Sequence, residues 1–309
     1  MLVAGPAPAQ EWPSRPLRLV VPYAAGGLPD TMARLLGQRL AESLGQNVLV
    51  DNRPGAGGIS GTELVARSPA DGYTLLVADV GQLAINPFLY ANLPYDPLKD
   101  FAPVSLIGTS TLFLVAHPSV AANNLAELAA LAKAQPGRLN YGSSGTGSIQ
   151  HIATEVLKTA LGIELVHVPY KGTAQAVPAL LGGQVALLFS ALPSIEAHRK
   201  AGRVKLLAAS TLKRSREAPN VPTVAEQGVP GYSFTPEIGL VAPAATPIAI
   251  VQRLSAAVAK AVAHPELAQR YAQLGIEPVG STPQAYAAVI HDSYDKYAVA
   301  VRISGAKAE

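Results

Sequence analysis

A loop of glycine, serine and threonine at residues 142–148 comes close to two known chemical motifs. It resembles a phosphate-binding P-loop, in which a lysine holds the terminal phosphates of a nucleotide, but Ser148 occupies the lysine position. It also differs from the strained turn that exposes a nucleophilic serine, because Thr146 replaces the second glycine of that motif. The loop therefore gives little support to triphosphate binding or to serine hydrolysis.

The same loop has the composition of an anion site that needs no cationic side chain. A Gly/Ser loop that runs into a helix exposes unpaired backbone N–H groups and the positive end of the helix dipole. Gly26 and Gly27 precede another predicted helix, over residues 28–44, in the same way. Two such neutral sites could hold a small carboxylate or dicarboxylate between them. Tight turns with well-capped helices explain the glycines equally well.

Other polar side chains stand at the ends of predicted strands, where each has a functional and a structural interpretation. Asp79 follows a strand and could face a ligand, and Tyr23 and Tyr170 could each wall a cleft or be half-buried aromatics. Asp30 and Asp79 could form an acid–base pair, but an acid in the first turn of a helix is better explained by the helix dipole. His151, one turn into its helix, could donate to a ligand or serve in capping and packing.

Composition and charge exclude several classes of protein. The chain has 309 residues, no cysteine, six scattered histidines and a formal charge of +3. Disulfides and thiolate chemistry are therefore excluded, and the histidine spacing supports no metal site. The basic residues form no stripe, so we expect no nucleic-acid partner.

The start of the chain has the small-residue pattern of the end of a signal peptide, with cleavage after Ala9. The charged and apolar parts of such a peptide are missing, so an ordinary flexible N-terminus is the alternative. We expect residues 1–14 to be a flexible remnant of an export signal, and the folded part to begin near Arg15.

Strand-like and helix-like segments alternate along the chain, which favours parallel sheets with ligands at the carboxyl ends of the strands. The predicted strands cover residues 17–21, 48–50, 74–78, 112–116, 165–168, 185–189 and 206–209. The predicted helices cover residues 28–44, 59–67, 124–133, 148–161, 174–181, 194–200, 247–263, 265–275 and 283–304. Two α/β lobes facing each other across a cleft are the simplest architecture.

Seven segments, in order, resemble signature segments of the Bug family, the solute-binding proteins of tripartite tricarboxylate transporters. They are residues 21–30, 52–58, 95–101, 140–148, 168–172, 222–226 and 242–243. Each segment alone is modest evidence, but the ordered set is specific, and the resemblance runs from about Pro16 to the last predicted helix.

The resemblance implies an α/β, type II-like periplasmic binding protein with two lobes, each a mostly parallel sheet flanked by helices, and a ligand cleft between them. Residues 15–113 and 238–309 would form lobe 1, and residues 114–237 lobe 2. It implies a periplasmic monomer without enzymatic activity, cofactor or metal. Its partners would be a small carboxylate, dicarboxylate, acidic amino acid or aromatic acid, and the membrane subunits of the transporter.

The resemblance also implies site residues in both lobes. In lobe 1 they are Tyr23, Ala25, Gly26, Gly27 and Leu28, flanked by Val80 and Gly81, with Asp79 beside them. In lobe 2 they are Ser143, Ser144, Gly147 and Ser148, with Lys171, Gly172, Thr173 and Ser190 nearby.

Several residues depart from the family pattern. Relatives carry an acid where Ser190 stands, and its loss makes an amino-acid ligand less expected here. Glu237 stands where relatives carry an aromatic residue, and Pro29 and Asp79 are also atypical. These departures leave open a ligand other than an ordinary dicarboxylate. An α/β enzyme using Asp79, His151 or Ser144, and a sensory receptor without a transport role, remain the alternative hypotheses.

Overall fold

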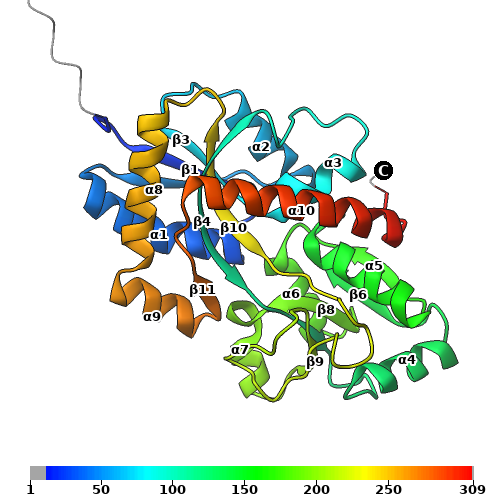
Figure 1. Ribbon diagram of the computed structural model, residues 1–309. Helices are drawn as coiled ribbons and strands as arrows, with labels where there is room; N and C mark the ends of the chain where they lie inside the picture. The colour runs from blue at the N-terminus through cyan, green and yellow to red at the C-terminus, as the bar shows by residue number, and fades with distance from the viewer. Residues whose placement is uncertain (1–11, 308–309) are drawn as a thin grey trace, which may run out of the picture.

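The β-rich segments of the chain form two separate sheets, each covered by helices (Figure 1). The computed structural model describes residues 12–307, so the predicted cleavage after Ala9 lies outside the described residues. The strand order is β11-β4-β10-β3-β1-β2 in the first sheet and β7-β6-β8-β5-β9 in the second. The two-lobed α/β fold predicted from the sequence is confirmed.

Each sheet combines a parallel part with antiparallel strands. The first contains β1 (Leu17–Val21), β2 (Val48–Asn52), β3 (Thr74–Ala78), β4 (Phe101–Ser110), β10 (Glu237–Pro243) and β11 (Ile276–Pro278). The second contains β5 (Leu112–Ala116), β6 (Asn140–Ser143), β7 (Val166–Pro169), β8 (Leu187–Ala191) and β9 (Lys205–Ala209). In the first sheet β10 and β11 run opposite to the other strands, and in the second sheet β5 does. Most strands of each sheet thus run in one direction, but both sheets are mixed, since three of the five neighbouring pairs in the first sheet and two of the four in the second are antiparallel.

Except for the short helix α3, which was not predicted, the helices follow the predicted segments closely. They are α1 (Leu28–Leu44), α2 (Ile59–Ala66), α3 (Asn86–Leu89), α4 (Leu125–Ala134), α5 (Ile149–Leu161), α6 (Thr173–Leu181), α7 (Leu192–Lys200), α8 (Ile248–Val262), α9 (Pro265–Gln273) and α10 (Pro283–Ser304). The Asn124 side chain caps α4 by accepting the Glu127 N–H, as the sequence predicts. Gly45, with φ of 67°, ends α1 in the left-handed conformation that glycine adopts without strain.

Strands β4, β10 and β11 were not predicted, because proline and glycine interrupt them. Pro103 lies within β4, and the pairing of β4 with β10 shifts register between Leu240 and Val241, the partner of Pro103. A shift of this kind accommodates a residue that cannot donate to the sheet. At Gly239 of β10 a side chain would lie 2.1 Å from the Tyr286 ring, so glycine lets α10 pack directly on the sheet.

The chain passes between the two sheets at two places, each directly at the end of a strand. Strand β4 ends at Ser110 and β5 begins at Leu112, and the chain returns through Pro236 into β10. Leu112 and Phe113 thus belong to the second sheet, and Glu237 belongs to the first. The predicted lobes, residues 15–113 with 238–309 and residues 114–237, stay a prediction.

Helix α10 spans both lobes. Figure 1 shows it crossing the first lobe and continuing beside α5 of the second. Its Tyr297 ring meets the Phe234 ring edge-on, with 5.8 Å between the ring centroids. The last helix therefore supports the junction between the two sheets from one side.

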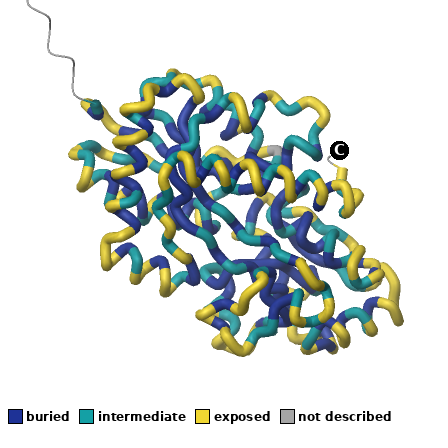
Figure 2. The backbone as a smooth tube through the Cα atoms, in the orientation of Figure 1, coloured by how far each residue is buried: buried dark blue, intermediate teal, exposed yellow. Residues whose placement is uncertain are grey.

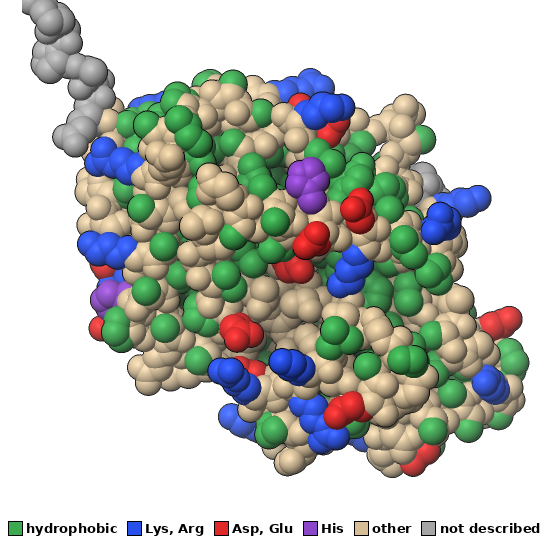
Figure 3. All heavy atoms as spheres, viewed as in Figure 1, with side chains coloured by type: hydrophobic (Ala, Val, Ile, Leu, Met, Phe, Trp, Pro, Cys, Tyr) green, Lys and Arg blue, Asp and Glu red, His purple; other side chains and the backbone are tan. Residues whose placement is uncertain are grey.

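Buried backbone is concentrated in the strands and on the inner faces of the helices, as Figure 2 shows. In the part of the chain that the structure describes, no helix combines the length and apolarity needed to cross a membrane. On the face drawn in Figure 3, acidic and basic side chains are interspersed, and the basic ones form no stripe.

Candidate ligand-binding cavity between the lobes

A small cavity of about 50 Å³ lies between the lobes, at the carboxyl ends of the parallel strands. The first lobe lines it with Tyr23, Ala24, Gly27, Leu28, Pro29, Asp79, Pro236 and Ile238. The second lobe lines it with Leu112, Ser144, Ile149, Gln150, Gly172, Thr173, Ala191 and Ser194. This is the position in which open α/β sheets bind ligands.

The N-termini of four helices meet at this cavity. Gly27 precedes α1, Ile149 begins α5, Gly172 precedes α6 and Ala191 precedes α7, and all four residues line the cavity. Of these helices, one comes from the first lobe and three from the second. Among the described lining residues Asp79 is the only charged one. The positive ends of the helix dipoles therefore dominate the electrostatics of the second-lobe wall.

The loop from β6 to α5 forms one part of that wall. Gly145 and Gly147 have φ of 130° and 81°, conformations that favour glycine, and they let the loop turn sharply into α5. The Ser144 hydroxyl, which lines the cavity, donates to Gln150 Oε1 at 2.8 Å. Ser148 caps α5, since its hydroxyl accepts the His151 N–H.

Buried and half-buried side chains beside this loop fix its shape. The Ser143 hydroxyl contacts His167 Nε2 at 2.7 Å, and His151 Nδ1 accepts the Gly147 N–H at 3.2 Å. The His151 and His167 rings stack with 4.0 Å between centroids. Burial, followed by the charge of a protonated His151, lowers the pKa of His167 to about 3. Burial also lowers the pKa of His151, so both rings are neutral supports of the loop.

The start of α6 forms the second part of the wall. The Gly172 carbonyl accepts the N–H groups of Gln175 and Ala176, which leaves those of Thr173 and Ala174 without a partner inside the helix. Gly172 has φ of 128°, and a Cβ at this position would lie 3.9 Å from the Ala24 Cβ of the first lobe. The two lobes thus approach each other closely at this edge of the cavity.

The first-lobe wall is built differently, around Asp79. The Tyr23 hydroxyl donates to Asp79 Oδ1 at 3.0 Å, and the Gly81 N–H donates to the same oxygen at 2.7 Å. Gln82 Nε2 donates to the Tyr23 hydroxyl at 2.8 Å. A Cβ on Gly81 would lie 2.8 Å from Asp79 Oδ1, so glycine is required for this arrangement. Burial raises the pKa of Asp79 to about 6 and, together with the Asp79 charge, raises that of Tyr23.

Asp30 has a structural role that agrees with its sequence interpretation. Burial alone would raise its pKa, but hydrogen bonds from Arg34, the Gly26 N–H and Asn52 outweigh burial and lower the pKa. These bonds tie the turn before α1 to the end of β2. Asp30 does not line the cavity with Asp79, so the two acids do not form a catalytic pair there.

The structure brings together part of the predicted site. Tyr23, Gly27, Leu28, Asp79, Ser144, Gly172 and Thr173 all line the cavity. Val80, Gly81, Ser143, Gly147 and Ser148 are buried around it and shape it, whereas Ala25 and Gly26 are exposed in the turn before α1. Lys171 is exposed and lines an adjoining interlobe opening, which also contains His151 and His167 and shares Tyr23, Ala24 and Ser144 with the cavity.

Two residues singled out from the family pattern do not line the cavity. Ser190 is fully buried within β8, opposite Phe113 of β5. Glu237 points to α10, where its Oε2 accepts the Ser293 hydroxyl at 2.6 Å. Burial raises the pKa of Glu237.

Sequence reasoning missed several lining residues, namely Ala24, Leu112, Ile149, Gln150, Ser194, Pro236 and Ile238. Most are apolar or small and follow a strand or begin a helix. What they share is a position within three residues of the end of a strand or helix, where the sequence predicts no particular chemistry.

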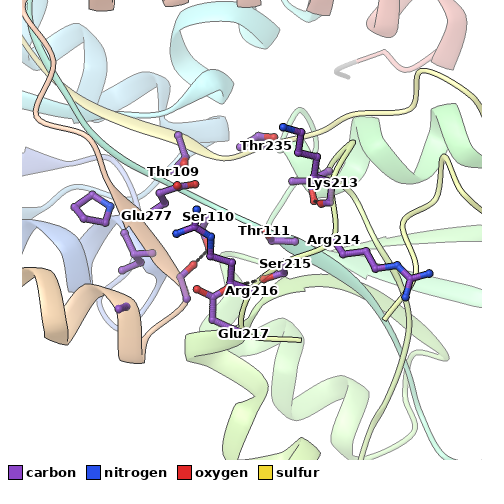
Figure 4. A pocket seen from close by; sticks show the side chains of 15 residues that line it. Thr109, Ser110, Thr111, Lys213, Arg214, Ser215, Arg216, Glu217, Thr235 and Glu277 are labelled. Carbon is purple, nitrogen blue, oxygen red and sulfur yellow. Dashed lines mark hydrogen bonds between the residues drawn. The ribbon is translucent and has the colours of Figure 1, made fainter. Parts of the chain in front are cut away.

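A larger groove of about 730 Å³ lies where the strands cross between the lobes (Figure 4). Side chains from β4, β11 and residues 211–217 converge on it. It mixes charges of both signs, including Arg216, Glu217 and Glu277, and Arg214 is paired with Glu226 at 2.9 Å. The small cavity, with its convergent helix N-termini, is therefore the better candidate for binding a small anion.

Two α/β lobes with a small cavity between them, at the carboxyl ends of parallel strands, are the architecture of a solute-binding protein. The family model described as "Tripartite tricarboxylate transporter family receptor" matches residues 32–305. The chain belongs to this family, which confirms the resemblance to the Bug proteins.

Known relatives agree with this assignment over nearly the whole chain. Protein BugT of Bordetella pertussis is 38% identical over 306 residues, covering 99% of this chain and 94% of BugT. The structure of R. palustris Rpa4515 with adipate is 36% identical with a TM-score of 0.92, covering 96% of this chain and 99% of that one. The structure of MatC from Rhodopseudomonas palustris with bound malate is 32% identical with a TM-score of 0.89, and the match covers 94% of this chain and 100% of that one.

Proposed function

We propose that this protein is a periplasmic receptor that captures a small organic acid between its lobes and delivers it to the membrane subunits of a tripartite tricarboxylate transporter. It reaches the periplasm by an export signal and works as a monomer, as the family resemblance implies. Adipate and malate in the related structures support a carboxylate ligand. The observation that carries the proposal is the meeting of four helix N-termini at one cavity.

The ligand carboxylate binds the second-lobe wall through backbone N–H groups. Thr173 and Ala174 offer N–H groups that α6 does not use, and α5 and α7 begin at the same wall. Helix N-termini bind carboxylates without a cationic side chain because their N–H groups and dipoles both favour negative charge. The cavity of about 50 Å³ suits an acid smaller than the drug-sized ligands that fill pockets of roughly 300–1,000 Å³.

Binding rather than catalysis is the work of this cavity. The Ser144 hydroxyl donates to Gln150, an amide that cannot serve as a general base. Asp79 accepts from Tyr23 and Gly81 instead of pairing with a second carboxylate. The protein acts by closing on a ligand that contacts both lobes, since such a ligand stabilises the closed arrangement. The close approach of Gly172 to Ala24 supports this closure.

A screen of small acids tests the proposal. Purified protein is heated in the presence of mono- and dicarboxylic, hydroxy, amino and aromatic acids, and hits are measured by calorimetry. A ligand at 100 times its Kd adds about 2.7 kcal/mol to the free energy of unfolding, enough for a clear rise in Tm. The amide of each hit, which lacks the carboxylate, is the matched control and is expected not to bind. If no acid raises the Tm, or if amides bind as well as acids, the proposal is wrong.

A further inference from the structure

The two oxygens of the Asp79 carboxylate have different surroundings. Oδ1 accepts two hydrogen bonds, from the Tyr23 hydroxyl at 3.0 Å and from the Gly81 N–H at 2.7 Å. Among the described residues, no donor contacts Oδ2. Since Asp79 lines the cavity, its unpartnered oxygen is an acceptor available to a ligand.

The hydrogen bonds around Asp79 have only one consistent direction. The Asp79 N–H can only donate, so the Gln82 oxygen at 3.0 Å must be Oε1, and the Gln82 amide group must face Tyr23. The Tyr23 hydroxyl therefore accepts a hydrogen bond from Gln82 and donates one to Asp79 Oδ1. Because Oδ1 already accepts two hydrogen bonds, the free acceptor of this network is Oδ2.

The first-lobe wall offers a second ligand carboxylate fewer backbone donors than the second-lobe wall, because only α1, of the four helices that start at the cavity, belongs to the first lobe. Asp79 is the only charged residue among the described lining residues, so no cation of the lining neutralises it. Pro29 in the first turn of α1 has no N–H, which removes one of the donors that the start of this helix would otherwise offer. A ligand with two carboxylates would place like charges together at this end.

We propose that the ligand of this receptor is a monocarboxylate whose other end carries a hydrogen-bond donor, a hydroxyl or an ammonium group, that binds Asp79 Oδ2. The carboxylate faces the three helix N-termini of the second lobe, and the donor faces the first lobe. The inference rests on the proposed function, and it differs from the family pattern, in which the first-lobe turn holds a carboxylate. Asp79 is thus a specificity-determining residue.

A matched series of four-carbon acids tests the inference by calorimetry at pH 7.5. The probes are butyrate, 4-hydroxybutyrate, 4-aminobutyrate and succinate, followed by the three-, five- and six-carbon counterparts of each. We expect the hydroxy or the amino acid of one length to bind at least tenfold more tightly than the plain acid and the diacid, because a hydrogen bond to a charged group discriminates to this extent. The stronger of the two identifies the donor as hydroxyl or ammonium.

The Asp79→Asn variant sharpens this test. Asparagine keeps the acceptor for Tyr23 and Gly81 but removes the charge, so we expect the diacid to gain at least tenfold in affinity relative to the hydroxy or amino acid. Asp295→Asn, on the exposed side of α10, is the matched control and is expected to leave the order of affinities unchanged. If Asp79→Asn does not fold, as judged by its melting curve, the wild-type order of affinities decides.

Failure of this inference is distinguishable from failure of the proposed function. If the diacid binds the wild-type protein as tightly as the hydroxy and amino acids of its length, the inference is wrong and the receptor proposal stands. An Asp79→Asn variant that folds and keeps the wild-type order of affinities also overturns the inference. If no acid of this series binds, the inference is wrong, and the proposed function is also wrong if the wider screen of small and aromatic acids finds no ligand.

Discussion

The two walls of the cavity are built from the same unit, a parallel strand followed by a turn and a helix, but they present opposite chemistry. The second lobe brings the starts of α5, α6 and α7 to the cavity, with no charged lining residue among those described. The first lobe brings the start of α1 together with the Asp79 carboxylate. On the proposed binding mode, one architecture serves an anion in one lobe and a hydrogen-bond donor in the other, and the residue that follows a single strand makes the difference.

The largest effect is expected where the lobes meet. Gly172→Val places a branched side chain at a φ of 128°, facing Ala24 across the cavity edge, and prevents closure on the ligand. We expect the affinity for the best acid to fall more than about 100-fold by calorimetry, equivalent to about 2.7 kcal/mol. Gly137→Val is the matched control, because Gly137 has φ of 68° and a Cβ there would have no neighbouring atom within 4 Å. Equal losses of affinity in both variants would show that backbone strain, not closure, is responsible.

The Asp79 carboxylate is expected to make stability depend on pH. Its pKa is about 6 in the folded protein against 3.8 for an ordinary aspartate, so folding favours its protonated form between about pH 4 and 6. Stability from this group is present at pH 4 and is lost as pH rises through 6. The wild-type protein loses this stability between pH 4 and pH 7, and Asp79→Asn does not. The free energy of unfolding of the variant minus that of the wild type should therefore rise by about 2 kcal/mol from pH 4 to pH 7.

Urea denaturation of the unliganded proteins at both pH values measures this gain. Asp295→Asn again controls for the loss of one negative charge away from the cavity. A constant difference between Asp79→Asn and wild type across this pH range would contradict the burial of an ionised Asp79.

A smaller effect is expected from the cap of the second-lobe helix. Ser148→Ala removes the hydroxyl that accepts the His151 N–H, which should cost about 1 kcal/mol of stability and weaken acid binding several-fold as the start of α5 loosens. Asn124→Ala removes the cap of α4, in the same lobe but away from the cavity, and should cost similar stability without changing affinity. Thermal unfolding and calorimetry of both variants separate the two effects. If the two variants bind acids equally well, α5 does not contribute to the site.

The smallest effect is expected from the nearest exposed cation. Lys171 lines the neighbouring opening and not the cavity, so Lys171→Ala should change acid affinity less than about twofold, as exposed charges contribute little. Calorimetry at low and high salt checks this expectation. A tenfold loss would mean that the second-lobe wall requires a cationic side chain, contrary to the comparison of the two walls.

Local sequence signals predicted the scaffold of the site. The turns at Gly27 and at residues 142–148 lead into α1 and α5 as expected, because glycine and a serine cap leave a strong local signature. Strand β8 begins two residues later than predicted, which puts Ala191 at the start of α7 and Ser190 inside the sheet. Local hydrophobicity does not resolve a shift of that size.

The chemistry of the first-lobe wall could not be predicted from local signals. Tyr23 and Asp79 are 56 residues apart, and only the pairing of β1 with β3 brings their strand ends together. The family pattern singles out Glu237 as atypical without fixing where it points, and the unpredicted strand β10 directs it to Ser293 of α10. Contacts of this kind depend on tertiary structure, which periodicity alone does not contain.

The most direct test of the central claim is a crystal structure of this protein with its tightest-binding acid. The account predicts carboxylate oxygens within about 2.7–3.2 Å of backbone nitrogens at the starts of the second-lobe helices, including Thr173, and a ligand hydroxyl or ammonium group at the same range from Asp79 Oδ2. A ligand with its carboxylate on the first-lobe wall, or bound in the groove lined by Arg216 and Glu277, would contradict it.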